Sequence, residues 1–321
     1  MPGVRKGRAV FLAASLLVAG FVGLTWAQYR REIEQERRRA STGSQIVKTP
    51  CGLIEYAATG SGPPVLLVHG AGGGYDQGLS LGVPLARRGL YVIAMSRFGY
   101  LRTPLPADAS AAAQADAHAC LLDVLGIRRA AIAGAPAGAP SAMQFVLRHP
   151  DRSSALVLLV PAVYVPRSGG APPLKTPAGT QFLFETALKS DFLFWAAIRL
   201  ARPVVTRAIL ATPPEVVKNA DAAEKVRVGE LLRQILPVCT RRAGLLNDAA
   251  VTSALPRYDL ERVAVPTLVI SMADDLFGTF DGARYTAEHV PGAQFKGYPS
   301  GGHVWVGHHK EIVAEIAAFL K

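Results

Sequence analysis

Cysteine is scarce in this chain of 321 residues, which holds only Cys51, Cys120 and Cys239. The three form neither a repeated disulfide framework nor the C-x-x-C pair of a structural metal site. An odd count permits at most one intramolecular disulfide, so cysteine usage does not determine the cellular compartment. Cys120 lies in the apolar stretch HACLLDVLGI, where we expect a small buried side chain.

The chain also lacks a basic cluster of the kind that binds nucleic acid. Its net charge is +11, but residues 1–39 hold eight Lys and Arg against three Glu, and so account for +5 of it. The remaining +6 is spread over the other 282 residues without interleaved aromatic side chains. Apolar residues make up 50% of the chain, enough for a sizeable core. We therefore expect a globular protein that does not bind nucleic acid.

One long uncharged run stands at the N-terminus. Residues 9–27, AVFLAASLLVAGFVGLTWA, follow the basic segment MPGVRKGR and come close to the roughly 20 residues that cross a bilayer. Trp26 and Tyr29 fall where an interfacial aromatic belt would lie. We predict a single-pass membrane anchor over residues 1–28 with an extracytoplasmic domain, or alternatively a cleaved signal peptide and secretion. Residues 29–45, rich in Glu and Arg, are predicted to form a charged juxtamembrane stalk.

From residue 46 onward, short apolar runs alternate with helical patterns. VLLVHG, YVIAMS, AAIAG and SALVLLVP are typical of strands buried on both faces. The alternation predicts an α/β fold with a doubly wound, mostly parallel sheet formed by residues 46–161 and 263–321. Residues 162–262 contain proline-rich breaks and helical stretches but no comparable strand run. We predict that they form a helical cap, inserted after about the sixth strand.

The stretch AIAGAPAGAPSAMQF, residues 131–145, has the pattern of a strand, a sharp turn of small residues and a helix. This is the setting of the nucleophile elbow, G-x-S-x-G. Gly134 and Gly138 keep the frame, but Pro136 stands where a serine is expected. Proline has no nucleophilic atom, and its ring holds φ near −65°. Ser141 lies in the following helix, and we expect it to point into the helix packing.

Three other segments carry residues typical of a hydrolytic site. VHGAGGG, residues 68–74, is a glycine loop after a strand, and SRFGYLRTP, residues 96–104, follows the next strand. SMADDLFG places Asp275, beside Asp274, after a C-terminal strand, and SGGHVWVGH places His303 after the last strand. A carboxylate that binds one imidazole nitrogen keeps the other free to act as a base.

On these four segments, the chain resembles the α/β-hydrolase superfamily over nearly all of residues 50–321. The resemblance implies a triad in which Pro136 occupies the nucleophile position, Asp275 is the acid and His303 the base. The order of the three positions along the chain is the order that this family uses. Asp274 is the alternative acid.

The resemblance also implies an oxyanion hole made by the backbone amides of Ala71 and Ala137. In this family the cap closes over the site, so we expect the aromatic cap residues Phe192 and Trp195 to line an apolar substrate pocket. The histidines near His303 fit no standard zinc spacing, and neither a metal nor another cofactor is expected.

Two functions follow from this reading. The first is hydrolysis of esters or related small apolar substrates, slowed or abolished because Pro136 replaces the nucleophile. The second is a catalytically inactive pseudo-hydrolase that binds a ligand or a partner. The sequence determines neither the substrate nor the oligomeric state.

Overall fold

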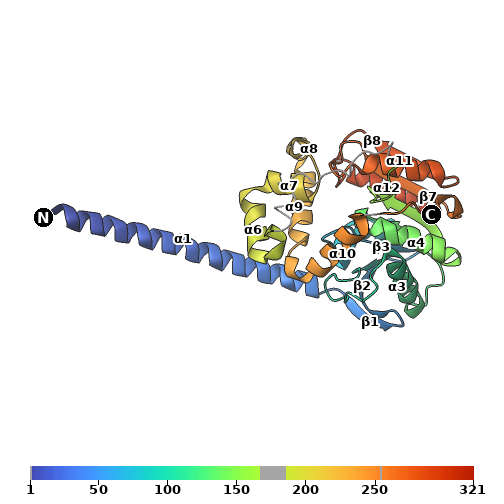
Figure 1. The fold of residues 1–321 in the computed structure, drawn as a ribbon, viewed down its shortest axis with the longest axis horizontal. Helices are drawn as coiled ribbons and strands as arrows, with labels where there is room; N and C mark the ends of the chain where they lie inside the picture. Colours follow the sequence, from blue (N-terminus) through green and yellow to red (C-terminus); the bar gives the residue numbers. More distant parts are fainter. Residues whose placement is uncertain (1, 167–185, 254) are drawn as a thin grey trace.

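The fold is built around one eight-stranded sheet (Figure 1). The computed structural model describes residues 2–166, 186–253 and 255–321. The strands follow the order β1-β2-β4-β3-β5-β6-β7-β8 across the sheet. β1 pairs with β2 and β2 with β4 in antiparallel fashion, and every other pair is parallel. The strands are β1 (Gln45–Thr49), β2 (Gly52–Thr59), β3 (Pro64–Val68), β4 (Tyr91–Met95), β5 (Ala130–Gly134), β6 (Ser153–Leu159), β7 (Thr267–Met272) and β8 (Gln294–Tyr298). The predicted doubly wound, mostly parallel sheet is confirmed.

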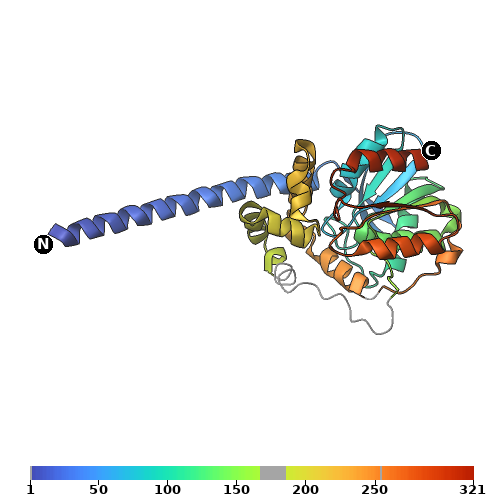
Figure 2. The same cartoon turned by 90° about the horizontal axis from the view of Figure 1, so that it is seen from above.

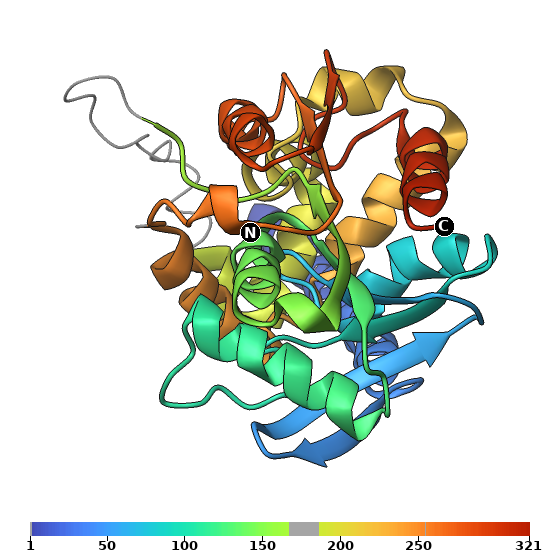
Figure 3. The same ribbon diagram turned by 90° about the vertical axis from the view of Figure 1, so that its right-hand side faces the viewer.

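Helices cover both faces of this sheet (Figure 3). α3, α4 and α11 contribute to the apolar core on one face, and α2 and α12 to the core on the other. Between β6 and β7 the regular elements of the described residues are helices, and this helical insertion is called the cap below. The helices are α1 (Pro2–Ser41), α2 (Tyr75–Ala86), α3 (Ala111–Val124), α4 (Ala139–Arg148), α6 (Asp191–Leu200), α7 (Arg202–Ile209), α8 (Pro214–Asn219), α9 (Ala222–Gln234), α10 (Arg242–Ser253), α11 (Thr279–His289) and α12 (His309–Phe319). Residues 182–185 of the predicted cap helix lie outside the described residues.

The central strands are continuous apolar runs because both of their faces are covered. In β3, Leu66 and Val68 join the core beneath α3 and α4, whereas Val65 and Leu67 join the core beneath α2 and α12. Alternate side chains of a strand point to opposite faces, so each face needs its own apolar residues. β8, which forms one edge of the sheet, has no fully buried residue.

The N-terminal residues form one long helix that projects from the body of the protein (Figures 1 and 2). Within the described residues, no helix is long and apolar enough to cross a membrane. The predicted membrane-spanning segment over residues 9–27 is therefore not supported. The last part of α1 packs on the cap, where Tyr29 and Ile33 are buried with cap residues such as Trp195. The segment predicted as a stalk therefore belongs to the folded body.

A disulfide joins Cys51, in the turn between β1 and β2, to Cys120 in α3. Our expectation that Cys120 is simply a small buried residue was wrong. The fold brings the Cα atoms of the two cysteines to 6.1 Å from each other although 69 positions separate them in sequence, a separation suited to a disulfide. Cys239 is a free, exposed thiol.

Candidate active site

The loops that follow β7 and β8 bring a carboxylate and an imidazole together. Asp275 Oδ2 lies 2.9 Å from Nδ1 of His303, and both side chains are buried. β7 and β8 are adjacent and parallel, so their carboxyl ends meet at the same edge of the sheet. With Nδ1 held by the carboxylate, Nε2 of His303 is the nitrogen left to exchange a proton.

The neighbouring carboxylate, Asp274, has a different task. Its Oδ1 accepts a hydrogen bond from the amide of Gly302 at 2.7 Å, and its Oδ2 accepts one from Gly301 at 3.2 Å. Asp274 thus fastens the loop that carries the histidine, while Asp275 contacts the imidazole itself. The contact with His303 is thus made by Asp275, the residue predicted as the acid, and not by the alternative, Asp274.

The surroundings of Asp275 keep it ionised. Burial acts to raise the pKa of its carboxyl group, but the nearby His303 and the hydrogen bonds to the carboxylate outweigh burial, and the pKa lies below its usual value. The donors are the Thr279 hydroxyl and the amide of Phe277, the latter at 2.9 Å. A buried, ionised carboxylate can hold the imidazole in one orientation and stabilise it when it gains a proton.

Pro136 occupies the turn between β5 and α4. It begins a short 3₁₀ helix, Pro136–Gly138, and its carbonyl accepts a hydrogen bond from the amide of Ala162 at 3.0 Å. The preceding residue, Ala135, has φ −84° and ψ 165°, the extended conformation that proline imposes on its predecessor. Pro136 is not among the residues with positive φ. The turn therefore lacks the strained conformation in which an elbow presents its nucleophile.

Close packing explains why Gly138, the last residue of the elbow motif, is a glycine. A Cβ on Gly138 would lie 2.5 Å from the Val68 carbonyl oxygen and 2.8 Å from that of His69, so only glycine lets α4 begin against the end of β3. The Pro136 ring also packs closely against Gly70. A Cβ built on Gly70 would lie 3.2 Å from Cδ of Pro136. The turn at residue 136 and the glycine loop are thus in contact.

The two predicted oxyanion donors lie in these two loops. Within the described part of the chain, neither the Ala71 amide nor the Ala137 amide donates a hydrogen bond to another protein group. Their neighbours are occupied, since the Gly70 amide binds Gln77 and the Gly72 amide binds the Tyr100 hydroxyl. Amides that have no protein acceptor are available to hold an oxyanion.

A buried ion pair between Arg97 and Asp248 contacts the glycine loop. Arg97 forms a two-pronged salt bridge with Asp248 of α10, at 2.6 and 2.7 Å, and donates from Nε to the His69 carbonyl at 2.9 Å. The Tyr100 hydroxyl donates to the same carboxylate. The Arg97 amide donates to Nε2 of His69, whose pKa is held well below its usual value by burial and by the positive charge of Arg97. The sequence singled out the segment 96–104 but not the partner of Arg97.

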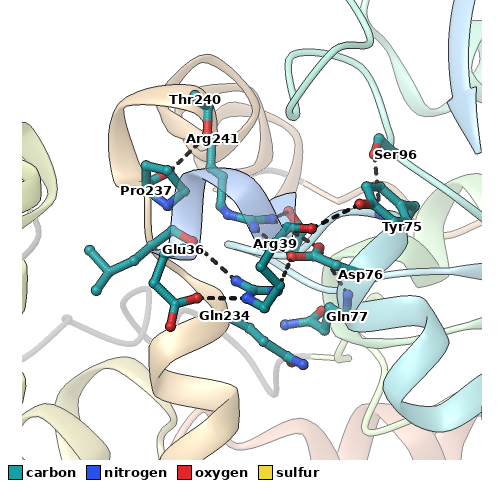
Figure 4. A network of polar contacts seen from close by, with 12 residues as sticks. Glu36, Arg39, Tyr75, Asp76, Gln77, Ser96, Gln234, Pro237, Thr240 and Arg241 are labelled. Atoms are coloured by element: carbon teal, nitrogen blue, oxygen red, sulfur yellow. Dashed lines mark hydrogen bonds and ion pairs between the residues drawn. The ribbon is translucent and has the colours of Figure 1, made fainter. Parts of the chain in front are cut away.

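A second network ties the glycine loop to the cap and to α1 (Figure 4). Arg241, a cap residue with no exposed surface, donates to the carbonyl of Gly73 and to Asp76, at 2.7 Å from Oδ2. Arg39 of α1 donates to the same Oδ2 at 2.6 Å and to Glu36 at 2.6 Å. The guanidinium groups of Arg39 and Arg241 are thus paired with the carboxylates of Glu36 and Asp76. Charged side chains can be buried when they are paired in this way.

The cap also holds the loop of His303. Arg227 of α9 donates to the carbonyl of Val304 at 2.7 Å, and Glu224 accepts from the Gly307 amide at 2.9 Å. Because the cap contacts the glycine loop and the histidine loop, it bridges the two sides of the site.

The cap residues Phe192 and Trp195, predicted to line a substrate pocket, contact α1. The Phe192 and Trp195 rings pack against Tyr29 of α1, with centroids 5.1 and 5.5 Å away, so the structure places them between the cap and α1. The aromatic ring beside the histidine is Phe277, which meets His303 edge-on at 4.8 Å. Phe277 stands two positions after Asp275, and this proximity in sequence is the signal that could have identified it.

Ser141 and three histidines distant in sequence from His303 have local contacts of their own. Ser141 is buried, donates to the Gly138 carbonyl at 3.1 Å and lies 3.1 Å from Nε2 of His118. Burial lowers the pKa of His118 to about 3, so this histidine is neutral. His149 contacts Asp116 and His289 contacts a backbone carbonyl. Among the described residues, no group of three His, Cys, Asp or Glu side chains is placed to hold a metal ion.

Comparison with known proteins identifies the family of the fold. The profile of the alpha/beta hydrolase fold family matches residues 63–306. An uncharacterized hydrolase of Bacillus subtilis, YcgS, is 26% identical over 268 residues, which is 80% of this chain and 90% of that protein. A putative carbamate hydrolase of Klebsiella pneumoniae, RutD, is 28% identical over 246 residues, 75% of this chain and 84% of the relative.

Solved structures show the same fold. An alpha/beta hydrolase fold protein from Nakamurella multipartita has a TM-score of 0.64 and 27% identity, with 86% of this chain and 98% of that chain covered. An esterase from Exiguobacterium antarcticum has a TM-score of 0.68 at 18% identity, with the same coverage, and is similar in fold. Since the family profile spans most of the sequence, the chain belongs to the α/β-hydrolase fold family.

Proposed function

We propose that this protein has a hydrolase site of the esterase type that is silenced at one position, and that the chain as it stands binds an ester or a related small apolar molecule without rapid turnover. One observation carries the proposal. The acid–base pair Asp275–His303 is assembled, while the turn that should present the nucleophile holds Pro136.

The proposed roles follow from the geometry. In a chain with a serine at position 136, its Oγ would attack the substrate carbonyl and Nε2 of His303 would take the proton. Asp275 would orient and stabilise the imidazolium. The amides of Ala71 and Ala137 would hold the oxyanion of the tetrahedral intermediate. His303 would then return the proton to the leaving group.

With Pro136 in place, this chain has no atom at the elbow that can form the acyl intermediate. What is left is binding, the oxyanion amides and a histidine that can act as a general base on water. Without a nucleophile, these groups together give only slow hydrolysis. An esterase among the similar folds and a carbamate hydrolase among the relatives support a carbonyl-centred ligand.

The matching experiment is calorimetric titration of the unmodified chain with p-nitrophenyl butyrate, with p-nitrophenol release followed in the same samples. We expect saturable binding and a release rate close to that of buffer. Phe277→Ala, beside His303, should weaken binding, whereas the exposed cap variant Leu200→Ala should not. Fast release by the unmodified chain would show that another nucleophile exists, and an absence of binding would refute the ligand class.

The second candidate function is a pseudo-hydrolase whose ligand is another protein. Hydrogen bonds join the cap to the glycine loop and to the loop of His303. They favour a small-molecule site over a protein-binding site, because they hold in place the groups that would face a small ligand. A partner-binding role would predict no effect of Phe277→Ala on the affinity for the partner unless the partner entered the site.

We also propose that α1 associates with a lipid bilayer and that the domain lies outside the cytoplasm, with secretion as the alternative. Large apolar side chains of α1 are exposed, among them Phe11 (73%), Leu17 (75%) and Phe21 (71%), and such patches mark interaction sites. The Cys51–Cys120 disulfide supports export, since disulfides persist in oxidising compartments.

Export can be tested through the free thiol. We expect a maleimide that does not cross membranes to label Cys239 in intact cells, because this thiol is exposed. Cys239→Ser is the matched control and should abolish labelling. Labelling that requires permeabilised cells would place the domain in the cytoplasm, and labelled protein in the medium would identify the secreted form.

A further inference from the structure

The C-terminal half of α1 presents a basic face to solvent. A groove of about 620 Å³ runs along it, lined by Arg30, Arg31, Ile33, Glu34, Gln35, Arg37 and Arg38. The four arginines are all exposed. The four arginines and Glu34 occupy positions i, i+1, i+4, i+7 and i+8 of one helix face, so they lie on the same side of α1. On this face Arg38 pairs with Glu34 at 3.3 Å, and Arg37 at its edge lies 3.4 Å from Asp191 of α6.

The acidic residues of the segment are turned away from this face. Glu32 accepts a hydrogen bond from Nε1 of Trp195 at 2.7 Å and pairs with Arg199, both in the cap. Glu36 pairs with Arg39 in the buried network at the base of α1. Of the three glutamates only Glu34 stays on the outer face. The carboxylates of Glu32 and Glu36 thus point toward the body, whereas the side chains of Arg30 and Arg31 are exposed to solvent.

This basic face continues an apolar one. The exposed large apolar residues of α1 end at Trp26, which is 51% exposed, and the first outward arginine is Arg30. At 1.5 Å per residue, Trp26 and Arg30 are about 6 Å apart along the axis. That is close to the depth of the headgroup layer on one side of a bilayer, about 5–7 Å. An apolar segment, an interfacial tryptophan and a row of arginines therefore follow one another on one helix.

We propose that the outer face formed by Arg30, Arg31, Arg37 and Arg38 binds the headgroups of acidic phospholipids. The inference rests on the bilayer association proposed above and adds the lipid class and the orientation of the protein. Long basic side chains reach the headgroup layer while the adjoining apolar residues enter the hydrocarbon region. Because the opposite side of α1 packs on the cap through Tyr29 and Ile33, membrane binding places the cap next to the bilayer.

The test is flotation of the full chain with vesicles of phosphatidylcholine alone and of phosphatidylcholine with phosphatidylglycerol. We expect clearly tighter binding to the acidic vesicles, and a loss of about tenfold or more for Arg30→Gln/Arg31→Gln/Arg38→Gln, since each surface arginine adds about 1 kcal/mol on an anionic membrane. The matched control is Arg87→Gln/Arg88→Gln/Arg128→Gln, which removes the same charge from exposed positions away from α1 and should bind like the unmodified chain.

Each other outcome has a distinct meaning. Equal binding to both kinds of vesicle, with no effect of the α1 variant, overturns the acidic-lipid inference and leaves bilayer association standing. Binding to neither kind of vesicle overturns both proposals. Self-association of the full chain without vesicle binding, seen by light scattering, would identify a second copy of the chain as the occupant of α1 and would also overturn the inference.

Discussion

Pro136→Ser is expected to create an esterase from this chain. We expect kcat/KM for p-nitrophenyl butyrate to rise by about 10³-fold or more, because the loss of a triad nucleophile typically leaves only the contribution of the oxyanion hole and of binding. The substitution supplies a hydroxyl at the elbow, and the proposed base is already oriented, with Nδ1 of His303 held 2.9 Å from Asp275. It also removes the ring that sets φ at this turn, so the backbone can adopt the elbow conformation.

Two comparisons make this result specific to the elbow. Adding His303→Ala to Pro136→Ser should abolish the gain, since the serine then has no base. Pro140→Ser, which places a serine one turn further on in α4, should stay inactive. A fluorophosphonate probe reports the activated serine whatever the substrate, and should label Pro136→Ser alone. If Pro136→Ser neither hydrolyses esters nor takes up the probe, the proposed site is not assembled.

Asp248→Asn is expected to destabilise the protein by about 3 kcal/mol or more, read as the free energy of unfolding in urea. Asp248 and Arg97 are each 5% exposed, and their two hydrogen bonds are 2.6 and 2.7 Å long. Removing the carboxylate charge leaves the Arg97 guanidinium buried without a counter-charge, which costs far more than the same change at the surface. The Tyr100 hydroxyl would lose its anionic acceptor as well.

The matched control is Asp259→Asn, which removes the same charge from an exposed pair. Asp259 and Arg262 lie 3.4 Å apart, with side chains 68% and 72% exposed, and such pairs are worth about 0–1 kcal/mol. In the Pro136→Ser background, Asp248→Asn should also lower kcat, because Arg97 holds the His69 and Gly70 carbonyls of the glycine loop. Similar stability of the two Asn variants would show that the cap does not depend on this pair.

The ion pair illustrates what a single sequence can show. Arg97 stands in a segment that the pattern singled out, but Asp248 is 151 positions away, within a cap whose helices carry no recognisable motif. Likewise, Phe192 and Trp195 were predicted to line the pocket because they are aromatic. Their burial against Tyr29 depends on the packing of α1 onto the cap, which no local pattern encodes.

The sequence by itself predicted the alternation of strands and helices and the mostly parallel sheet, and it shows the substitution at the elbow. These follow from hydrophobic period and from short motifs, which act over a few neighbouring residues. Only the tertiary structure showed that Asp274 binds the loop of His303, paired Cys51 with Cys120 and placed the end of α1 against the cap. Each of these depends on contacts between segments far apart in the chain, and such contacts exist only once the sheet and the cap have packed.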